Sequence, residues 1–297
     1  MKITLLDGGM GQELLARTGD APTPLWATQV MLDHPDVVRA IHADYFAAGA
    51  TIATTNTYAI HHDRLERFDM DHLFETLHAK AASQAAEARA AHGSGRIAGS
   101  MGPLVASYRS DVALPVAEAQ PKYAEIARLL APHVDFFLLE TMASALQAEG
   151  ALRGAQVGGK PVWLSVTVDD ADGSRLRSGE PIADLAPLLA ELQPEAVLVN
   201  CSVPEAMEAA LAEVAAFGLP FGAYANGFTH ISEAFKADAP KVDVLHHRHD
   251  LTPELYASFA MGWIAQGATI VGGCCEVGPA HIAHLAGVLR AAGHQIV

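Results

Sequence analysis

Short apolar segments rich in β-branched residues recur along the chain, separated by alanine- and leucine-rich stretches with helical spacing. Runs of this kind are typical of strands buried in a parallel sheet. The segments predicted as strands are Ile3–Asp7, Thr51–Asn56, Arg96–Gly99, Val134–Glu140, Val162–Thr167, Ala196–Cys201, Phe221–Asn226 and Thr269–Cys274. Amphipathic helices are predicted between most of them, among them Leu73–Ala91, Ile182–Leu192 and Pro204–Phe217.

Eight strands that alternate with helices predict an α/β fold, a (β/α)8 TIM barrel formed by a single domain over residues 1–297. A doubly wound open sheet uses the same units, and the count of eight favours the barrel. No low-complexity segment or linker divides the chain. The longest irregular segments are Gly8–Asp33 and Asn226–Asp250, and the latter is predicted to be a long loop after the seventh strand.

Composition and charge exclude several classes of partner. The net charge is −15, and no basic cluster is present to neutralise phosphates, so neither nucleic acid nor anionic lipid is an expected partner. The apolar runs are shorter than the roughly 18–20 residues that cross a membrane. Three cysteines, two of them adjacent, do not make a disulfide framework, which favours a cytoplasmic location. An acidic surface is compatible with a monomer or a homodimer.

All three cysteines follow predicted strands. In a (β/α)8 barrel the chemistry belongs at the carboxyl ends of the strands. Cys201 ends the sixth strand, and Cys274 and Cys275 end the eighth, so one intervening strand separates them. Three thiolates that converge on one rim predict a metal site, and zinc is the expected ion for sulfur ligands, with its fourth position open for catalysis.

A zinc ion held by three thiolates favours one kind of chemistry. The site already carries a net negative charge, so the ion is a poor acid toward water or carbonyl groups. It can still bind an incoming thiol as thiolate at neutral pH, where a free thiol with a pKa of about 8.5 is mostly protonated. The bound sulfur stays nucleophilic, so alkyl transfer to a substrate thiol suits the site.

Six motifs together resemble the homocysteine S-methyltransferase family, across essentially the whole chain. They are "LLDGGMGQEL", "TTNTY", "LLET", "NCSVPEAM", "YANG" and "GGCCEVGPAHI". The family includes betaine– and S-methylmethionine–homocysteine methyltransferases and the homocysteine domain of cobalamin-dependent methionine synthase. The resemblance implies a zinc-bearing barrel that methylates homocysteine to methionine, with homocysteine and a methyl donor as its small-molecule partners.

The resemblance also implies roles for residues within the motifs. Cys201, Cys274 and Cys275 match the zinc ligands of the family. Asp7 and Glu140 match the residues that hold the homocysteine ammonium group, which suits two carboxylates on one rim.

Further residues are assigned by motif alone. Backbone amides around Gly8 and Gly9, or near Ser165, are candidates for binding the amino-acid carboxylate. Asn226 matches the position that fills the fourth zinc site when substrate is absent. Trp26 matches an aromatic residue near the methyl donor, and an aromatic face suits a sulfonium or ammonium methyl group.

The motifs leave the methyl donor open. Thr141 stands where betaine users tend to carry an aromatic residue, which favours a sulfonium donor such as S-methylmethionine or S-adenosylmethionine over betaine. Tyr58 and Tyr108 are candidates for the donor pocket, although ordinary packing explains each of them equally well. The chain departs from the family pattern at Glu276 and Val277, which changes the charge beside the expected metal site.

Two other functional classes remain open. A barrel aldolase or lyase needs a strand-end lysine for a Schiff base, a position that neither Lys122 nor Lys160 occupies. A non-catalytic zinc- or thiol-binding barrel would have no need of Asp7 and Glu140. The histidines of the segment His246–His249 predict a solvated polar loop rather than a second metal site.

Overall fold

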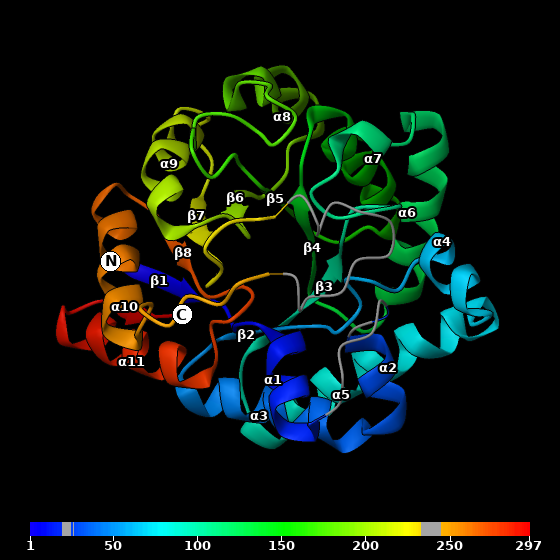
Figure 1. The fold of residues 1–297 in the computed structure, drawn as a ribbon, viewed down its shortest axis with the longest axis horizontal. Coiled ribbons are helices and arrows are strands. Elements are labelled where there is room, and N and C mark those ends of the chain that lie inside the picture. The colour runs from blue at the N-terminus through cyan, green and yellow to red at the C-terminus, as the bar shows by residue number, and fades with distance from the viewer. Residues whose placement is uncertain (20–24, 26, 233–244) are drawn as a thin grey trace.

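In the part of the chain that the structure describes, nine parallel strands form one curled sheet at the centre, and helices surround it (Figure 1). The structure, a computed structural model, describes residues 1–19, 25, 27–232 and 245–297. The strands are β1 (Lys2–Leu5), β2 (Ile52–Thr54), β3 (Arg96–Met101), β4 (Phe136–Met142), β5 (Val162–Val166), β6 (Ala196–Asn200), β7 (Phe221–Tyr224), β8 (Ile270–Val271) and β9 (Gln295–Ile296). Their order is β2-β3-β4-β5-β6-β7-β8-β1-β9, and the predicted TIM-barrel class is confirmed.

Helices connect the strands on the outside of the barrel. The α-helices are α1 (Met10–Thr18), α2 (Ala27–Asp33), α3 (Pro35–Ala48), α4 (His62–Leu65), α5 (Phe74–His92), α6 (Val116–Leu130), α7 (Ala145–Ala155), α8 (Ala186–Leu192), α9 (Met207–Ala215), α10 (Pro253–Ala265) and α11 (Pro279–Ala291). The predicted helix Leu73–Ala91 corresponds to α5. The predicted helices Ile182–Leu192 and Pro204–Phe217 each begin with a 3₁₀ turn before α8 and α9.

The prediction of an irregular segment over Gly8–Asp33 was wrong, because this segment contains α1 and α2. The helix α1 ends at Gly19, whose φ of 73° is readily adopted by glycine. Leu14 on α1 is fully buried, so the helix packs onto the barrel. The glycine-rich start of the segment hid this helix in the sequence.

The ends of the barrel sheet differ from the sequence prediction in two places. The strand expected over Thr269–Cys274 is paired only at β8, and the chain leaves the ladder at Gly272. There a Cβ atom would lie 2.4 Å from Leu6 Cβ, so only glycine allows so close an approach. The strand β9 was not predicted, since two residues at a sheet edge carry no periodic pattern.

Apolar side chains from the strands fill the interior of the barrel, as in other barrels of this size. This interior cluster consists of Leu6, Ile52, Ala98, Phe136, Leu138, Trp163, Ala196, Leu198, Tyr224 and Ile270. Cys274 packs at its edge, so the cluster forms a floor beneath the carboxyl ends of the strands. A larger apolar layer lies between the sheet and the helices.

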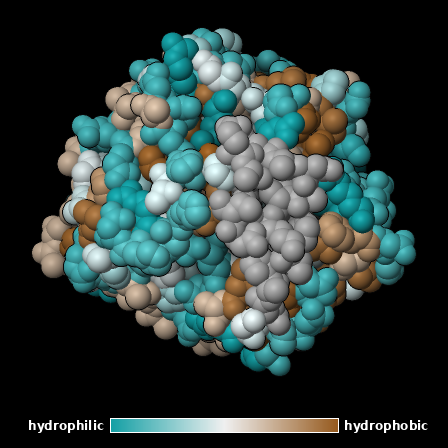
Figure 2. Space-filling view, viewed as in Figure 1, coloured by the Kyte–Doolittle hydropathy of each residue, from teal (hydrophilic) through white to brown (hydrophobic). Residues whose placement is uncertain are grey.

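Hydrophilic side chains predominate on the face shown in Figure 2, with hydrophobic ones in smaller patches. In the part of the chain that the structure describes, no helix combines the length and the apolar character needed to span a membrane.

Candidate active site

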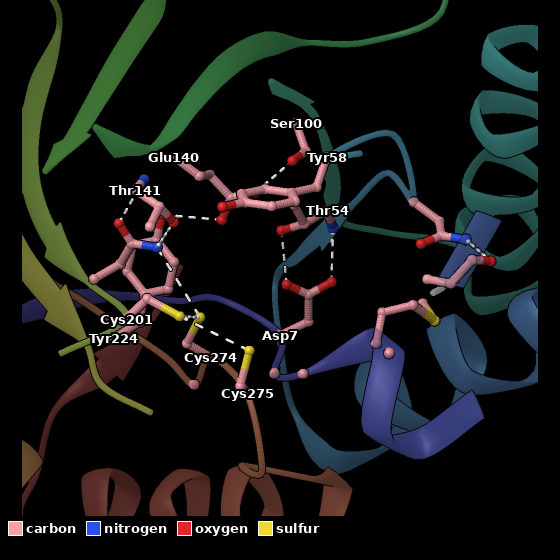
Figure 3. Close-up of a pocket in the computed structure, with 18 of the residues that line it drawn as sticks. Asp7, Thr54, Tyr58, Ser100, Glu140, Thr141, Cys201, Tyr224, Cys274 and Cys275 are labelled. Atoms are coloured by element: carbon pink, nitrogen blue, oxygen red, sulfur yellow. Dashed lines mark hydrogen bonds between the residues drawn. The ribbon is translucent and has the colours of Figure 1, made fainter. Parts of the chain in front are cut away.

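A cavity, partly open to solvent, lies at the carboxyl ends of the strands (Figure 3). Residues within or after β1, β2, β3, β4, β6, β7 and β8 line it, so nearly the whole barrel contributes. Such a position is where the chemistry of a (β/α)8 barrel is located.

The structure brings the three cysteine sulfurs together in this cavity. Cys201 Sγ lies 2.8 Å from Cys274 Sγ and 3.8 Å from Cys275 Sγ, and the three ligand atoms all lie within 4.8 Å of one another. Two sulfurs bound to one tetrahedral zinc ion, at about 2.3 Å each, are about 3.8 Å apart. The cluster is therefore of the right size to close around one ion, with the closest pair moving apart.

The paired cysteines lie on a turn that is tied to the end of β7. Cys274 N–H donates to Ala225 O at 3.0 Å, and Gly227 N–H donates to Cys275 O at 2.8 Å. Gly273 packs so closely that a Cβ there would lie 2.3 Å from Val277 Cγ1. These contacts orient the side chains of Cys274 and Cys275 toward Cys201.

The cysteine cluster already favours a thiolate. Hydrogen bonds from the thiols of Cys274 and Cys275 hold the pKa of Cys201 well below its usual range, despite its burial. Thiolates are the form in which cysteine binds metal ions. Among the described residues, this is the one group of cysteine, histidine and acidic side chains close enough to hold an ion.

Two buried carboxylates face the same space as the sulfurs (Figure 3). Asp7 accepts hydrogen bonds from Thr54 N and Thr54 Oγ1, each at 2.7 Å. Glu140 accepts one from Tyr224 Oη at 3.0 Å and another from Ser100 Oγ. Burial raises the pKa of both Asp7 and Glu140 to about 7. A cationic group bound between them would restore the ionised form of both.

The described lining of the cavity carries no positive side chain. The described residues that line it include no lysine, arginine or histidine. Two carboxylates and three thiols therefore set its charge, and the arrangement favours a cationic ligand. Without a lining lysine it also offers no amine for a Schiff base among these residues.

The other residues assigned by motif lie in different places. Gly8 lines the cavity, and a Cβ there would lie 2.0 Å from Val277 O. Ser165 is fully buried in the barrel wall, where its hydroxyl donates to Asn200 Oδ1 at 2.8 Å. Asn226 is fully buried, and the backbones of its neighbours Ala225 and Gly227 bond to those of Cys274 and Cys275. Trp26 lies outside the described residues.

Asn226 has one free polar atom. Its Oδ1 accepts a hydrogen bond from Phe228 N at 3.2 Å, whereas its Nδ2 has no partner. A buried amide N–H without a partner is unusual in a folded protein. Neither Asn226 nor Ser165 is part of the cavity lining described above.

Asn200 is a site residue that the sequence analysis missed. It lines the cavity, accepts a hydrogen bond from Thr141 N at 2.9 Å, and donates to Thr141 Oγ1 at 2.9 Å. Thr141 has a φ of 63°, and this pair of hydrogen bonds stabilises its left-handed backbone. The position of Asn200 directly before Cys201 is the only signal that the sequence offered.

Gln12 on α1 was also missed. It lines the cavity, and neither atom of its side-chain amide has a hydrogen-bond partner although both are buried. An amide in a ligand pocket can donate to and accept from a polar ligand group. The sequence analysis missed Gln12 because it predicted an irregular segment where α1 lies.

Tyr58 and Tyr108 both line the cavity. Tyr58 Oη lies 2.8 Å from Ser107 Oγ, and Tyr108 Oη donates to Cys201 Sγ at 3.0 Å. Burial raises the pKa of each phenol above its usual value, so both stay protonated at neutral pH.

The histidine loop contacts the turn after the paired cysteines. His247 Nδ1 lies 2.8 Å from a carboxylate oxygen of Glu276, and its ring lies 4.8 Å from that of His249. The loop is therefore fastened to the site through Glu276, the position at which the chain departs from the family pattern.

Comparison with known proteins agrees with this geometry. The sequence model of the family described as homocysteine S-methyltransferase matches residues 4–289. The chain belongs to the homocysteine S-methyltransferase family. The family resemblance and the prediction of an enzyme are thereby confirmed. A homocysteine S-methyltransferase of Escherichia coli strain K12 is 31% identical over 95% of this chain and 94% of its own.

Other members of the family are similar over the whole barrel. The homocysteine S-methyltransferase YbgG of Bacillus subtilis is 26% identical over 97% of this chain and 95% of its own. The metallated form of the homocysteine methyltransferase MmuM from Escherichia coli superposes with a TM-score of 0.81 at 27% identity, covering 97% of this chain and 96% of that one. That relative thus exists with a bound metal, which the cysteine cluster of this chain could also hold.

Proposed function

We propose that this enzyme transfers a methyl group from a sulfonium donor, such as S-methylmethionine or S-adenosylmethionine, to the thiol of homocysteine, giving methionine. Zinc held by Cys201, Cys274 and Cys275 would supply a site at which the substrate thiol loses its proton and stays nucleophilic. The observation that carries the proposal is that three sulfurs and two buried carboxylates line one cavity without a positive side chain among its described residues.

Asp7 and Glu140 would bind the ammonium group of homocysteine. Both carboxylates are buried, and burial raises the pKa of each to about 7, so a bound cation lowers the cost of ionising them. Charge-assisted hydrogen bonds to the ammonium would orient the substrate so that its sulfur reaches the cysteine cluster. Gly8, where the backbone itself forms the cavity wall, is the candidate contact for the substrate carboxylate.

The methyl transfer is a direct displacement. The sulfur of homocysteine forms a bond to the methyl carbon while the bond from that carbon to the sulfonium sulfur breaks, and the leaving sulfur keeps the electron pair as a neutral thioether. Binding of both substrates in one cavity would align the two sulfurs, and this positioning would supply most of the rate. No covalent bond to the enzyme is required.

The nature of the cavity supports a cationic donor. Its anionic lining attracts a sulfonium, and the rings of Tyr58 and Tyr108 offer faces for the charged methyl group. Thr141 leaves room where betaine users tend to carry an aromatic side chain. Betaine is the alternative donor.

A panel experiment tests the function. Zinc-loaded protein is incubated with homocysteine and separately with S-methylmethionine, S-adenosylmethionine or betaine, and methionine is measured by mass spectrometry. We expect methionine with a sulfonium donor and none from the chelated protein. Methionine formed with betaine alone would show that betaine, and not a sulfonium compound, is the methyl donor. No methionine with any donor, from protein that holds zinc, would favour a non-catalytic zinc-binding barrel or another thiol acceptor.

A further inference from the structure

A buried arginine lies behind the cysteine cluster, in the loop after β5. The side chain of Arg177 is only 7% exposed, and Arg177 Nη2 lies 2.9 Å from Asp170 Oδ1. Arg177 Nε donates to Thr167 Oγ1 at 2.9 Å. Few charged side chains are buried unless a partner compensates them, and this pair lies beside the site rather than at the surface.

The ion pair holds the backbone around Cys201. Cys201 O accepts hydrogen bonds from Arg177 Nη2 at 3.4 Å and from Thr167 Oγ1 at 3.3 Å. Asp170 Oδ1 accepts one from Val203 N at 3.1 Å. Cys201 has a φ of 51°, a left-handed conformation that costs a non-glycine residue about 1–2 kcal/mol. The surrounding contacts therefore have to stabilise it, and the Arg177–Asp170 pair contributes to them beside the hydrogen bond from Cys201 N to Tyr224 O at 3.2 Å.

The same guanidinium group also supports the side chain that contacts the Cys201 sulfur. The Arg177 guanidinium carbon lies 5.2 Å from the centre of the Tyr108 ring, within the range of a cation–π interaction. Tyr108 Oη in turn donates a hydrogen bond to Cys201 Sγ at 3.0 Å. Arg177 thus orders Cys201 from two sides, through its carbonyl group and through its thiol.

We propose that Arg177 is a positioning residue of the metal site and that Tyr108 is the hydrogen-bond donor through which it acts on the Cys201 sulfur. Three thiolates outweigh the charge of a divalent ion, and a phenol donor and a buried cation offset part of the excess. The hydrogen bond also aims Cys201 Sγ toward Cys274 and Cys275. Partners of this kind, one step removed from the ion, typically contribute 10–100-fold to metal affinity. The inference rests on the metal site of the proposed function.

Two substitutions test the proposal. Tyr108→Phe removes only the hydroxyl and keeps the ring over the guanidinium, and Arg177→Met removes the charge. We expect the zinc affinity of each variant, measured by competition with a chromophoric chelator, to fall about 10–100-fold. The control is Arg175→Met, on the same loop, because Arg175 is 50% exposed and pairs with Asp172 at the surface. Its zinc affinity should equal that of the parent protein.

A spectroscopic measurement separates positioning from general destabilisation. With Co²⁺ in place of zinc, loss of the hydrogen bond to sulfur should move the sulfur-to-cobalt charge-transfer band of Tyr108→Phe to lower energy, while Arg175→Met leaves it unchanged. The proposal would be overturned if the parent protein binds zinc and Tyr108→Phe has the same zinc affinity and the same band position as the parent. Parent protein that binds no metal would overturn the proposed zinc site instead. If Arg177→Met fails to fold, Tyr108→Phe decides alone.

Discussion

The Asp7 carboxylate accepts hydrogen bonds from both the backbone N–H and the hydroxyl of Thr54, each at 2.7 Å. These bonds cross the place where β1 and β2 meet, and within the described ranges no strand ladder joins these two strands. One backbone hydrogen bond, from Thr51 N to Leu5 O at 2.7 Å, assists them. The residue proposed to bind substrate therefore also closes the barrel.

Asp7→Asn should change stability in a pH-dependent way. Burial raises the pKa of Asp7 from 3.8 to about 7, so the stability that its protonated form contributes is present below pH 3.8 and is lost as pH rises through 7. Asparagine does not ionise, so the variant does not lose this stability as the pH rises. The free energy of unfolding of the variant, relative to that of the parent protein, should thus increase between pH 5 and pH 8, by up to about 3 kcal/mol.

Urea unfolding of both substrate-free proteins across this pH range measures the difference. Glu140 also titrates near pH 7 but is present in both proteins, so its contribution largely cancels in the comparison. A difference that stays constant with pH would show that Asp7 is ionised in the folded state throughout.

Glu140→Gln should weaken homocysteine binding. A hydrogen bond to a charged group contributes about 1.5–3 kcal/mol, which corresponds to about 10–100-fold in affinity. Calorimetric titration of the zinc-loaded protein with homocysteine measures the dissociation constant. Glu149→Gln is the matched control, because Glu149 pairs with Arg153 on the outer helix α7. Equal homocysteine affinities of the parent protein and Glu140→Gln would show that Glu140 does not bind the ammonium group.

Substitution of any one of the three cysteines by serine should abolish metal-dependent activity. Loss of a direct ligand should lower zinc affinity by more than the 10–100-fold typical of outer partners. Elemental analysis should find one zinc per chain in the parent protein. Because the chain has three cysteines in all, a thiol count should rise from none to three when the ion is removed by a chelator. Three reactive thiols in the zinc-loaded protein would contradict the assignment.

Gln12→Met should affect the methyl donor rather than homocysteine. The Gln12 amide is buried in the cavity without a partner, so a polar group of the donor is its expected ligand. Loss of one hydrogen bond should raise the KM for S-methylmethionine about tenfold and leave the KM for homocysteine unchanged. Steady-state kinetics with each substrate varied in turn distinguishes these effects.

The same change should stabilise the donor-free protein by about 1 kcal/mol, since it removes an unpaired buried amide. Gln29→Met is the control, because Gln29 on the surface of α2 already donates to Asp33 at 2.9 Å. An increased KM for homocysteine, with that for the donor unchanged, would place Gln12 at the acceptor side of the cavity.

The sequence by itself was sufficient for the barrel and for the meeting of its cysteines. The alternation of apolar runs with helical segments predicts parallel strands, the count of eight favours a barrel, and a barrel places all carboxyl ends on one rim. Cys201 and the pair Cys274–Cys275 therefore had to lie near one another, whatever the details of the loops. Asp7 and Glu140 reach the same rim for the same reason.

Only the tertiary structure decided how the site is supported. Arg177, Tyr108 and Cys201 come from loops after three different strands, and no periodic pattern in a single sequence links them. The same holds for Gln12, whose helix carries no clear signal, and for the early end of β8, which depends on the contact of Gly272 with Leu6. Local sequence specifies the strands through burial and spacing, whereas loop contacts depend on side chains that meet only when the barrel has closed.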